Sequence, residues 1–380
     1  SFHTGNEKEA LSLGSYTLDE GATAYLDANK FFQRHAVIVG STGSGKSWTT
    51  AKLLEQVALL ENSNAILFDL HGEYNTLKGD GIKHFKIAGP NDIDSGKDLD
   101  EGILFFPYWL LGYEDMVDLL VDRSDQNAPN QSMLISRTVN EAKRDYLENI
   151  GEKEIINTYT VDSPVPYSLV DVLAKLKELN VEMVPGAREG RKKQGEFHGK
   201  LSRFIARLEN KMSDKRLAFM MNPPESVLEW EWMNDLSRTL ISGRSQQKDD
   251  LSEVPSDVLP LVIGRIASLI FSLQQWTKKE HRHPIALLCD EAHLYVPESG
   301  TYGNVDTSQR SFERIAKEGR KYGVGLVIIS QRPSEVNKTI LSQCNNFIAM
   351  RLSNAEDQNV IKKLLPDNLG GTTEVLPTVD

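Results

Sequence analysis

The chain has 380 residues, of which 39% are hydrophobic and 26% are charged, and its formal net charge is -11 at pH 7. This composition is typical of a soluble globular protein, and the length allows one large core or two smaller ones. The acidic balance excludes a uniformly basic nucleic-acid-binding coat, although a local basic channel stays compatible with it. The two cysteines exclude a disulfide framework.

The first 30 residues are expected to form a separate N-terminal segment, a linker or remnant of a barrel, with a β-hairpin in the stretch SLGSYTLDEGATAYLDANK. The opening SFHTGNEKEA has no apolar signal-peptide core, and no apolar run of about 18 residues predicts a membrane span. We therefore expect a cytoplasmic protein without a membrane segment. Because the sequence does not begin with Met, we expect further residues to precede it.

The stretch GSTGSGKS follows the β-branched run 36–39 and precedes an apolar pattern of helical spacing. Strand, glycine-rich loop and helix form the context of a P-loop, in which backbone N–H groups and a helix N-terminus bind phosphate. Lys46 is expected to reach the β- and γ-phosphates of ATP, and the Ser47 hydroxyl to bind Mg²⁺. The expected nucleotide-binding residues of the loop are Gly40, Thr42, Gly43, Ser44, Gly45, Lys46, Ser47 and Trp48.

A second strand is predicted in NAILFDL (64–70), followed by HGEY. Asp69 and Glu73 then lie near the phosphate site, where Asp69 is expected to contact the bound nucleotide by orienting the water or the metal shell. His71 is a candidate sensor, but a lone histidine after a strand is more often only hydrogen-bonded, so both interpretations stay open.

Two short strands are predicted in HFKIA and GILFF, after which the pattern becomes helical as far as residue 235. We therefore predict an α/β fold: a RecA-like P-loop ATPase core with a mostly parallel sheet and an inserted helical bundle. The core comprises residues 31–107 and 236–365, the insert 108–235, and the C-terminal tail 366–380. TLISG (239–243) is predicted to return to strand, before a long apolar helix ending in SLQQW.

The apolar strand IALLC ends in Asp290 and Glu291. Asp290 suits the carboxylate that holds Mg²⁺ directly or through water, and Glu291 suits the base that polarises the attacking water. A further buried strand, GLVIIS, ends at Gln331, which is placed to sense the γ-phosphate, because ligands of open α/β sheets gather at the carboxyl ends of strands. ATP and Mg²⁺ are the cofactors that this set of residues predicts.

The motifs RHAVIVGSTGSGKS, FDLHGEY, LLCDEAHLYVP, AKEGRKYGVGLVIISQRPSEV and MRLSNAEDQ, together with PYWLLGYEDMVDLLVDRSDQNAPNQ, resemble the HerA branch of the HerA/FtsK ATPases. The resemblance extends from about residue 34 to 364. It implies a hexameric ring that hydrolyses ATP and moves or grips double-stranded DNA in a central channel. It also implies a partner, either a NurA-type nuclease or, in defence systems, an effector such as a sirtuin-type enzyme. The family's N-terminal β-barrel is not matched, which puts docking through that barrel in doubt.

The resemblance marks Arg320, in GRKYG, as an arginine finger, and Arg34 is the second candidate for that role. A guanidinium reaching across a subunit boundary would neutralise charge that develops on the γ-phosphoryl oxygens. The alternative for each residue is an ion-paired or surface arginine.

Two segments are candidates for DNA contact. Residues 186–219 contain ten Lys or Arg against four Asp or Glu, a composition that also suits a solvated helix face. The second candidate is the polar stretch after the Asp-Glu pair, expected to be a loop, in which Arg310 and Lys317 are the residues to test.

These observations favour an ATP-driven DNA translocase that acts as a ring in DNA repair or antiviral defence. One alternative is an ATP-regulated scaffold that activates a partner effector without sustained translocation. A secretion or conjugation ATPase shares the same core. A nucleotide kinase is disfavoured, because the Asp290–Glu291 pair suits attack by water.

Overall fold

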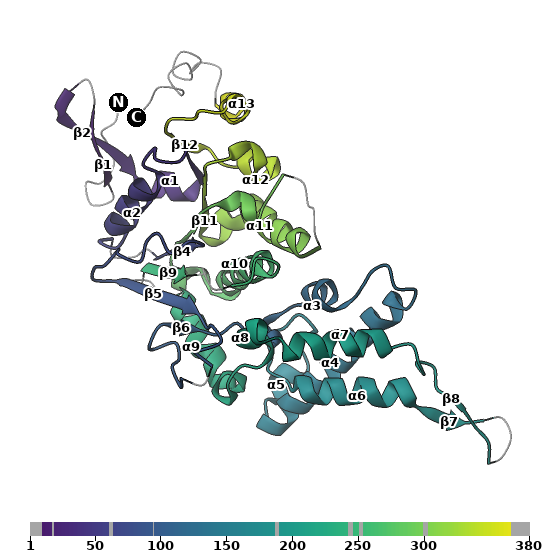
Figure 1. The fold of residues 1–380 in the computed structure, drawn as a ribbon. Helices are drawn as coiled ribbons and strands as arrows, with labels where there is room; N and C mark the ends of the chain where they lie inside the picture. Colours follow the sequence, from purple (N-terminus) through teal and green to yellow (C-terminus); the bar gives the residue numbers. More distant parts are fainter. Residues whose placement is uncertain are drawn as a thin grey trace. The chain divides into compact units, whose positions relative to one another are not determined.

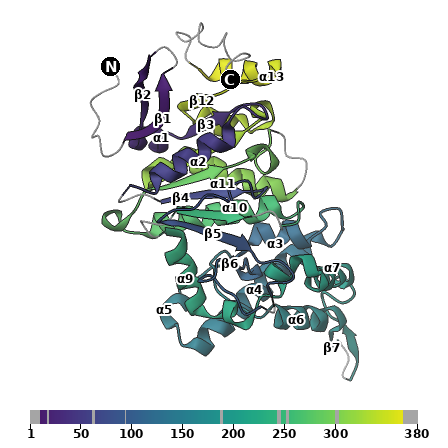
Figure 2. The ribbon, with the colours of Figure 1, turned by 60° about the vertical axis from the view of Figure 1, so that its left-hand side comes forward.

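The computed structural model describes residues 10–16, 19–60, 64–93, 95–186, 190–241, 246–250, 254–298 and 303–365. The chain divides into two compact units, drawn in Figures 1 and 2 and considered separately. Unit 1 comprises the described residues up to Ile87, Leu99–Leu104, and those from Leu236 onward; unit 2 comprises those of Ala88–Asp98 and Phe105–Asp235.

Unit 1 is built on an eight-stranded sheet whose paired strands, within the described residues, are all parallel. The P-loop strand β3 lies between β12 and β11, and the full order is β12-β3-β11-β10-β4-β9-β5-β6. The expected α/β fold with a RecA-like core is confirmed. The strands are β3 (Ala36–Val39), β4 (Asn64–Asp69), β5 (Ile82–Ile87), β6 (Ile103–Leu104), β9 (Gln246–Asp250), β10 (Ile285–Cys289), β11 (Val324–Ser330) and β12 (Asn346–Ala349).

The central strands are apolar on both sides because helices cover both faces of the sheet (Figures 1 and 2). Ala36 and Ile38 pack in a cluster with Leu53 and Leu54 of the P-loop helix, and α10 and α11 lie over the other face. The helices of unit 1 are α1 (Ala28–Gln33), α2 (Lys46–Val57), α10 (Leu259–Trp276), α11 (Gly303–Tyr322), α12 (Lys338–Ser342) and α13 (Ala355–Leu364), with 3-10 turns η5 (Lys279–His281), η6 (Ala292–Leu294) and η7 (Pro333–Glu335).

The expected N-terminal hairpin is confirmed as β1 (Ala10–Tyr16) and β2 (Asp19–Asp27), which pair antiparallel. Leu11 is buried in the cluster that contains the P-loop helix. The side-chain amide of Gln56, on α2, hydrogen-bonds both the backbone N–H and the carbonyl of Ser12. The hairpin β1–β2 therefore packs against helix α2 and is hydrogen-bonded to it.

Two sequence-based expectations in unit 1 are wrong. Residues 239–241 do not form a strand: they end helix α9 (Trp230–Ile241), because Trp232, Leu236 and Leu240 are buried at helical spacing and this packing outweighs the β-propensity of Thr239 and Ile241. The stretch after the Asp-Glu pair is also not mainly a loop, since α11 begins at Gly303 and carries both Arg310 and Lys317. Strands β9 and β12 were not predicted.

Unit 2 consists mainly of helices, together with a short antiparallel hairpin of β7 (Met183–Pro185) and β8 (Lys192–Gln194). None of the described helices of the chain combines the length and apolarity that a membrane span needs. Apart from α9, the helices of unit 2 are α3 (Tyr113–Leu120), α4 (Ala128–Ile150), α5 (Lys153–Ile156), α6 (Leu169–Val181), α7 (Ser202–Ser213) and α8 (Ala218–Met221), with 3-10 turns η2 (Tyr108–Leu110), η3 (Lys215–Leu217) and η4 (Glu225–Leu228).

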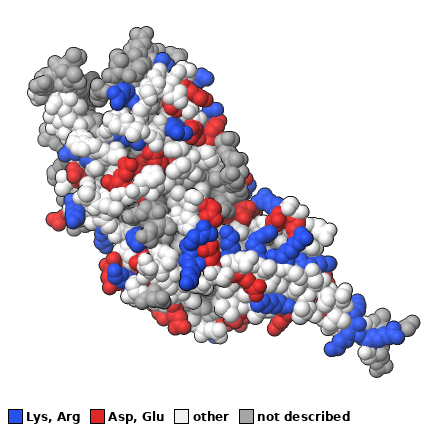
Figure 3. Space-filling view, viewed as in Figure 1, with Lys and Arg blue, Asp and Glu red and all other residues white. Residues whose placement is uncertain are grey.

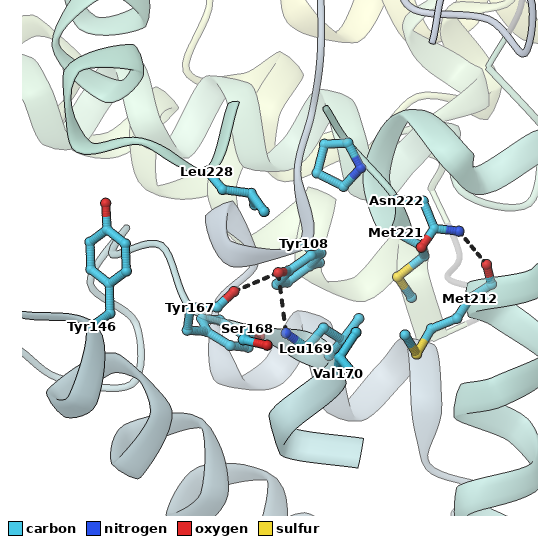
Figure 4. Close-up of a pocket in the computed structure, with 11 residues that line it drawn as sticks. Tyr108, Tyr146, Tyr167, Ser168, Leu169, Val170, Met212, Met221, Asn222 and Leu228 are labelled. Atoms are coloured by element: carbon cyan, nitrogen blue, oxygen red, sulfur yellow. Dashed lines mark hydrogen bonds between the residues drawn. The ribbon is translucent and has the colours of Figure 1, made fainter. Parts of the chain in front are cut away.

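A cavity of about 400 Å³ lies within unit 2 and is drawn in Figure 4. Its wall includes Tyr108, whose hydroxyl donates to the carbonyl of Tyr167 at 2.5 Å and accepts from the backbone N–H of Leu169 at 3.2 Å. Burial raises the pKa of Tyr108 to about 12, so this hydroxyl stays protonated and keeps both bonds. The tyrosine thereby joins η2 to the start of α6.

Candidate nucleotide-binding site

The P-loop connects β3 to α2 with a backbone that requires glycine. Gly45 precedes the first residue of α2 and has a φ of 95°, in the left-handed region that other residues rarely adopt. A Cβ on Gly40 would lie 2.2 Å from Ser44 Oγ and 2.9 Å from Met350 Cβ, so the loop folds closely over this position. The two glycines let the loop wrap the N-terminus of α2, which is a favourable location for phosphate.

The loop is tied to the chain that leaves β12, a contact that sequence reasoning missed. Ser41 N–H donates to the carbonyl of Arg351 at 2.8 Å, and the hydroxyls of Ser41 and Ser353 lie 3.1 Å apart. Because β12 pairs with β3 in parallel, its exit lies beside the P-loop. The segment MRLSN gave no local signal of this role other than its place in the family motifs.

Lys46 and Glu291 form an ion pair at the P-loop. Lys46 Nζ lies 3.6 Å from Glu291 Oε1, and the residues are only 9% and 6% exposed. Glu291 has a φ of 45°, a strained value for a residue with a side chain. Its second oxygen lies 3.3 Å from His293 Nδ1 without the alignment of a hydrogen bond, and that nitrogen is also 3.3 Å from Ser330 Oγ. Burial lowers the pKa of His293.

Asp290 lies in a pocket of negative charge. Burial and the neighbouring carboxylate of Glu291 raise the pKa of Asp290 to about 7, against the opposing effect of Lys46, and Glu73 adds to the rise. A divalent cation would relieve this repulsion. Among the described residues no cluster of three or more His, Cys, Asp or Glu is arranged to hold a metal. A serine hydroxyl and an aspartate carboxylate are oxygen donors of the kind that Mg²⁺ binds, together with water and phosphate.

Asp69 is fully buried at the end of β4. Its two oxygens accept the backbone N–H groups of Glu73 and Tyr74, each at 3.1 Å, so it shapes the turn after β4. That turn brings Glu73 to the P-loop helix, where Ser47 Oγ donates to Glu73 Oε2 at 2.5 Å. Sequence reasoning noted Glu73 near the phosphate site but assigned it no function.

The remaining expected contacts divide into two groups. Gln331 reaches the loop, because Thr42 Oγ1 donates to Gln331 Oε1 at 2.7 Å. Trp48 is 69% exposed on the first turn of α2, and His71 is also exposed. The structure thus places Gln331 at the site, whereas Trp48 and His71 face solvent.

Arg34 and Arg320 lie at the amino ends of the parallel strands, whereas the P-loop lies at their carboxyl ends. Arg34 precedes β3, whereas the P-loop follows it, and Arg320 lies in the last turn of α11, ahead of β11. With a rise of about 3.3 Å per strand residue, the stretch from Ala36 to Gly40 spans roughly 13 Å. Both arginines are exposed. Both therefore lie at the ends of the strands opposite to the phosphate site of their own chain.

His35 joins these two arginine-bearing segments. Its Nδ1 accepts the backbone N–H of Leu326 at 2.9 Å, so the proton is on Nε2, which donates to the carbonyl of Ala316 at 3.0 Å. Burial, together with the charge of Arg320, lowers the pKa of His35. The histidine is thus held neutral between β11 and α11.

The fold and the site together define a P-loop ATPase with a RecA-like core, since the P-loop, the Asp-Glu pair and Gln331 follow β3, β10 and β11 of one parallel sheet. A family model described as "Helicase HerA, central domain" matches residues 11–270. The chain belongs to the HerA family of P-loop ATPases.

Individual relatives are distant in sequence but similar along most of this chain. The DNA double-strand break repair helicase HerA of Pyrococcus furiosus is 23% identical over 396 residues, covering 93% of this chain and 63% of the relative. A probable helicase of Methanocaldococcus jannaschii is 26% identical, covering 93% of this chain and 59% of the relative. The chain therefore spans about three fifths of the length of these relatives.

Among solved structures, VirB4 of Thermoanaerobacter pseudethanolicus superposes with a TM-score of 0.60 at 16% identity, covering 99% of this chain and 92% of VirB4. At this identity the match shows a shared fold.

Proposed function

We propose that this chain is the motor of a six-membered ring that hydrolyses ATP to move along or grip double-stranded DNA. The relatives named as DNA double-strand break repair helicases support a role in DNA end processing, and the same motor would serve antiviral defence. Its partner would be a nuclease or another effector that acts on the DNA which the ring delivers.

The observation that carries the proposal is the separation of the two arginines from the phosphate site. Arg34 and Arg320 are exposed at the amino ends of the parallel strands (the amino edge), and the P-loop is at their carboxyl ends (the carboxyl edge). In a ring with head-to-tail contacts, the amino edge of one subunit can meet the carboxyl edge of the next. Each arginine would then complete the site of its neighbour, and an isolated subunit would turn over ATP very slowly.

The chemistry depends on the residues at the carboxyl edge. Glu291 takes a proton from the water that attacks the γ-phosphorus, after ATP has drawn Lys46 out of its ion pair with Glu291. Mg²⁺ would be held by Ser47 and Asp290, and when bound it offsets phosphate charge. Gln331, which contacts the P-loop through Thr42, would report the presence of the γ-phosphate to β11.

Mixing two inactive variants tests the trans arrangement. Arg320→Ala and Lys46→Ala should each abolish ATP turnover, with Arg320→Ala still binding ATP and assembling. In a randomly mixed ring about one quarter of the interfaces pair an intact arginine with an intact P-loop. Turnover should therefore return on mixing, and a mixture that stays inactive would contradict a finger supplied by the neighbour.

DNA contact is proposed for the hairpin β7–β8 of unit 2. Arg191, Lys192 and Lys193 are exposed there, and Figure 3 shows Lys and Arg gathered on this hairpin. On α11, Arg310 is exposed, whereas Lys317 pairs with Glu313 at 3.2 Å. Replacing the three hairpin residues with Gln should reduce the salt dependence of DNA binding by about 0.9 in the log–log slope for each lost phosphate contact. An unaltered slope would remove the hairpin from the DNA path, and Arg310→Gln tests α11 in the same way.

The alternative is an ATP-regulated scaffold that activates an effector without sustained translocation. The measurement that separates the two is ATP turnover with and without linear double-stranded DNA, with Lys46→Ala as the blank. Stimulation by DNA favours the motor. Turnover that responds only to the partner protein favours the scaffold, and it would also be the result for a secretion ATPase that shares the VirB4 fold.

A further inference from the structure

Glu73 accepts a hydrogen bond from the hydroxyl group that is expected to bind the metal ion. The Ser47 hydroxyl donates to Glu73 Oε2 at 2.5 Å, which is the distance of a strong charge-assisted hydrogen bond. Ser47 is the residue of the P-loop that binds Mg²⁺ in the proposed function. Glu73 comes from the turn after β4, 26 residues further along the chain.

The turn that carries Glu73 is firmly built. The carboxylate of Asp69, which is fully buried, accepts the backbone N–H groups of both Glu73 and Tyr74. Gly72 has a φ of 67°, and the following Tyr74 is buried against the P-loop helix side of the core. The backbone of Glu73 is therefore held by its neighbours, and its exposed side chain reaches Ser47 from this turn.

The chemistry of a hydroxyl explains why an acceptor at this point matters. Ser47 Oγ has one proton and two lone pairs, and a metal ion needs a lone pair. Because its O–H bond points at Glu73, the hydroxyl group has both lone pairs directed away from that carboxylate. Outer-shell partners of this kind orient the metal ligand and raise its basicity.

Charge adds a second effect. The carboxylates of Glu73 and Glu291 contact the neighbouring residues Ser47 and Lys46 in the first turn of α2, so together they form a negative field where the phosphates are expected. This field opposes the binding of a free nucleotide, whose phosphates are anionic, and favours a nucleotide that brings a divalent cation.

We propose that Glu73 is a positioning residue that orients Ser47 toward Mg²⁺ and makes the site selective for the metal complex of the nucleotide over the free nucleotide. This inference rests on the proposed function, because it requires that the site binds Mg²⁺ with a nucleotide.

The test measures binding of a fluorescent ADP (mant-ADP) to the full chain, first in EDTA and then over a Mg²⁺ series. In Glu73→Ala the Mg²⁺ concentration that gives half of the metal-dependent tightening should rise about 10- to 100-fold. Binding in EDTA should be at least as tight as in the wild type, because a negative charge has been removed. Glu55→Gln, an exposed position on α2, is the matched control and should behave as the wild type.

Further variants separate a positioning role from other effects. Glu73→Gln keeps an acceptor oxygen for Ser47 but loses the charge, so it should retain most of the Mg²⁺ dependence while binding in EDTA tightens. In a Ser47→Ala background, Glu73→Ala should add a much smaller loss of Mg²⁺ dependence than it causes alone, because only the effect of its charge is left once the Ser47 hydroxyl is absent.

Wild-type Mg²⁺ dependence in Glu73→Ala would overturn the inference, as would additive losses in the double variant. Failure of the wild-type chain itself to bind mant-ADP, or to respond to Mg²⁺, would instead refute the proposed function. Thermal unfolding of each nucleotide-free variant establishes that the turn after β4 is intact; if Glu73→Ala lowers the unfolding temperature, the comparison is made with Glu73→Gln.

Discussion

Glu291→Gln should have two opposite effects on the same site. Turnover of ATP should fall at least 10²-fold, because the amide cannot accept the proton of the attacking water. Nucleotide affinity should rise, because the wild-type protein has to separate Lys46 from Glu291 before Lys46 can reach the phosphates. In the variant this ion pair is absent, and the repulsion between Glu291 and the phosphates is absent as well.

The size of the gain can be worked out from the geometry. Unit charges 3.6 Å apart attract by about 4–5 kcal/mol at an effective dielectric constant of about 20. Only part of this energy is recovered, since the carboxylate that ATP releases gains new contacts with water. We expect a net effect of about 1.4–2.8 kcal/mol, which is a 10- to 100-fold lower Kd.

The affinity is measured by titration with a fluorescent ATP analogue, and turnover by phosphate release. Glu335→Gln is the control: it removes the same charge from an exposed carboxylate that pairs with Arg332, and it should leave both quantities near the wild-type values. If Glu291→Gln binds the nucleotide no more tightly than this control, the Lys46–Glu291 pair does not compete with nucleotide binding and the reasoning is wrong.

Three further substitutions test other contacts. His35→Ala should destabilise the protein by about 2–4 kcal/mol, because the N–H of Leu326 and the carbonyl of Ala316 lose their partner. The pKa of His35 is lower in the folded protein than in the unfolded chain, so the unfolded chain binds a proton first as the pH falls below about 6.5. The wild type should therefore lose stability toward pH 5.5, and the variant should lack this contribution. Urea unfolding at pH 5.5 and at pH 8 measures the difference. Tyr108→Phe should lower the free energy of unfolding by about 1–3 kcal/mol, because it leaves the Leu169 N–H without an acceptor; an unchanged denaturation midpoint would contradict the bridging role. Gly40→Ala should weaken mant-ADP binding more than tenfold with an unaltered circular dichroism spectrum, since the new methyl group would clash with Ser44 and Met350; wild-type affinity would show that the loop adapts.

The elements that the sequence predicted correctly are those whose signal is local. The run 36–39 followed by GSTGSGKS specifies strand, loop and helix through apolar patterning and the backbone demands of Gly45, and the structure has each element at that place. Strand β10 ending at Asp290 and strand β11 ending before Gln331 are equally clear. Since parallel strands end at a common edge, their functional residues were expected to meet.

Where local and tertiary signals disagree, the sequence was misleading. Thr239 and Ile241 have β-branched side chains, yet they end α9, because Leu236 and Leu240 are buried on one face only when the segment is helical. Strand β12 has four half-buried residues at the edge of the sheet and too weak a pattern to be recognised alone. Its pairing with β3 is the reason that the P-loop has its contacts to Arg351 and Ser353.

The sequence by itself therefore determined the class of this protein, because the P-loop, the Asp290–Glu291 pair, Gln331 and the similarity to the HerA family can all be recognised in short motifs. Only the tertiary structure decided which groups hold one another in the site. The contacts Lys46–Glu291 and Ser47–Glu73 join helix α2 to the segments that follow β10 and β4, and the order of those strands in the sheet is a property of long-range packing. The same packing puts Arg34 and Arg320 at the edge opposite the P-loop, because residues before a parallel strand and residues after it lie at opposite edges of the sheet.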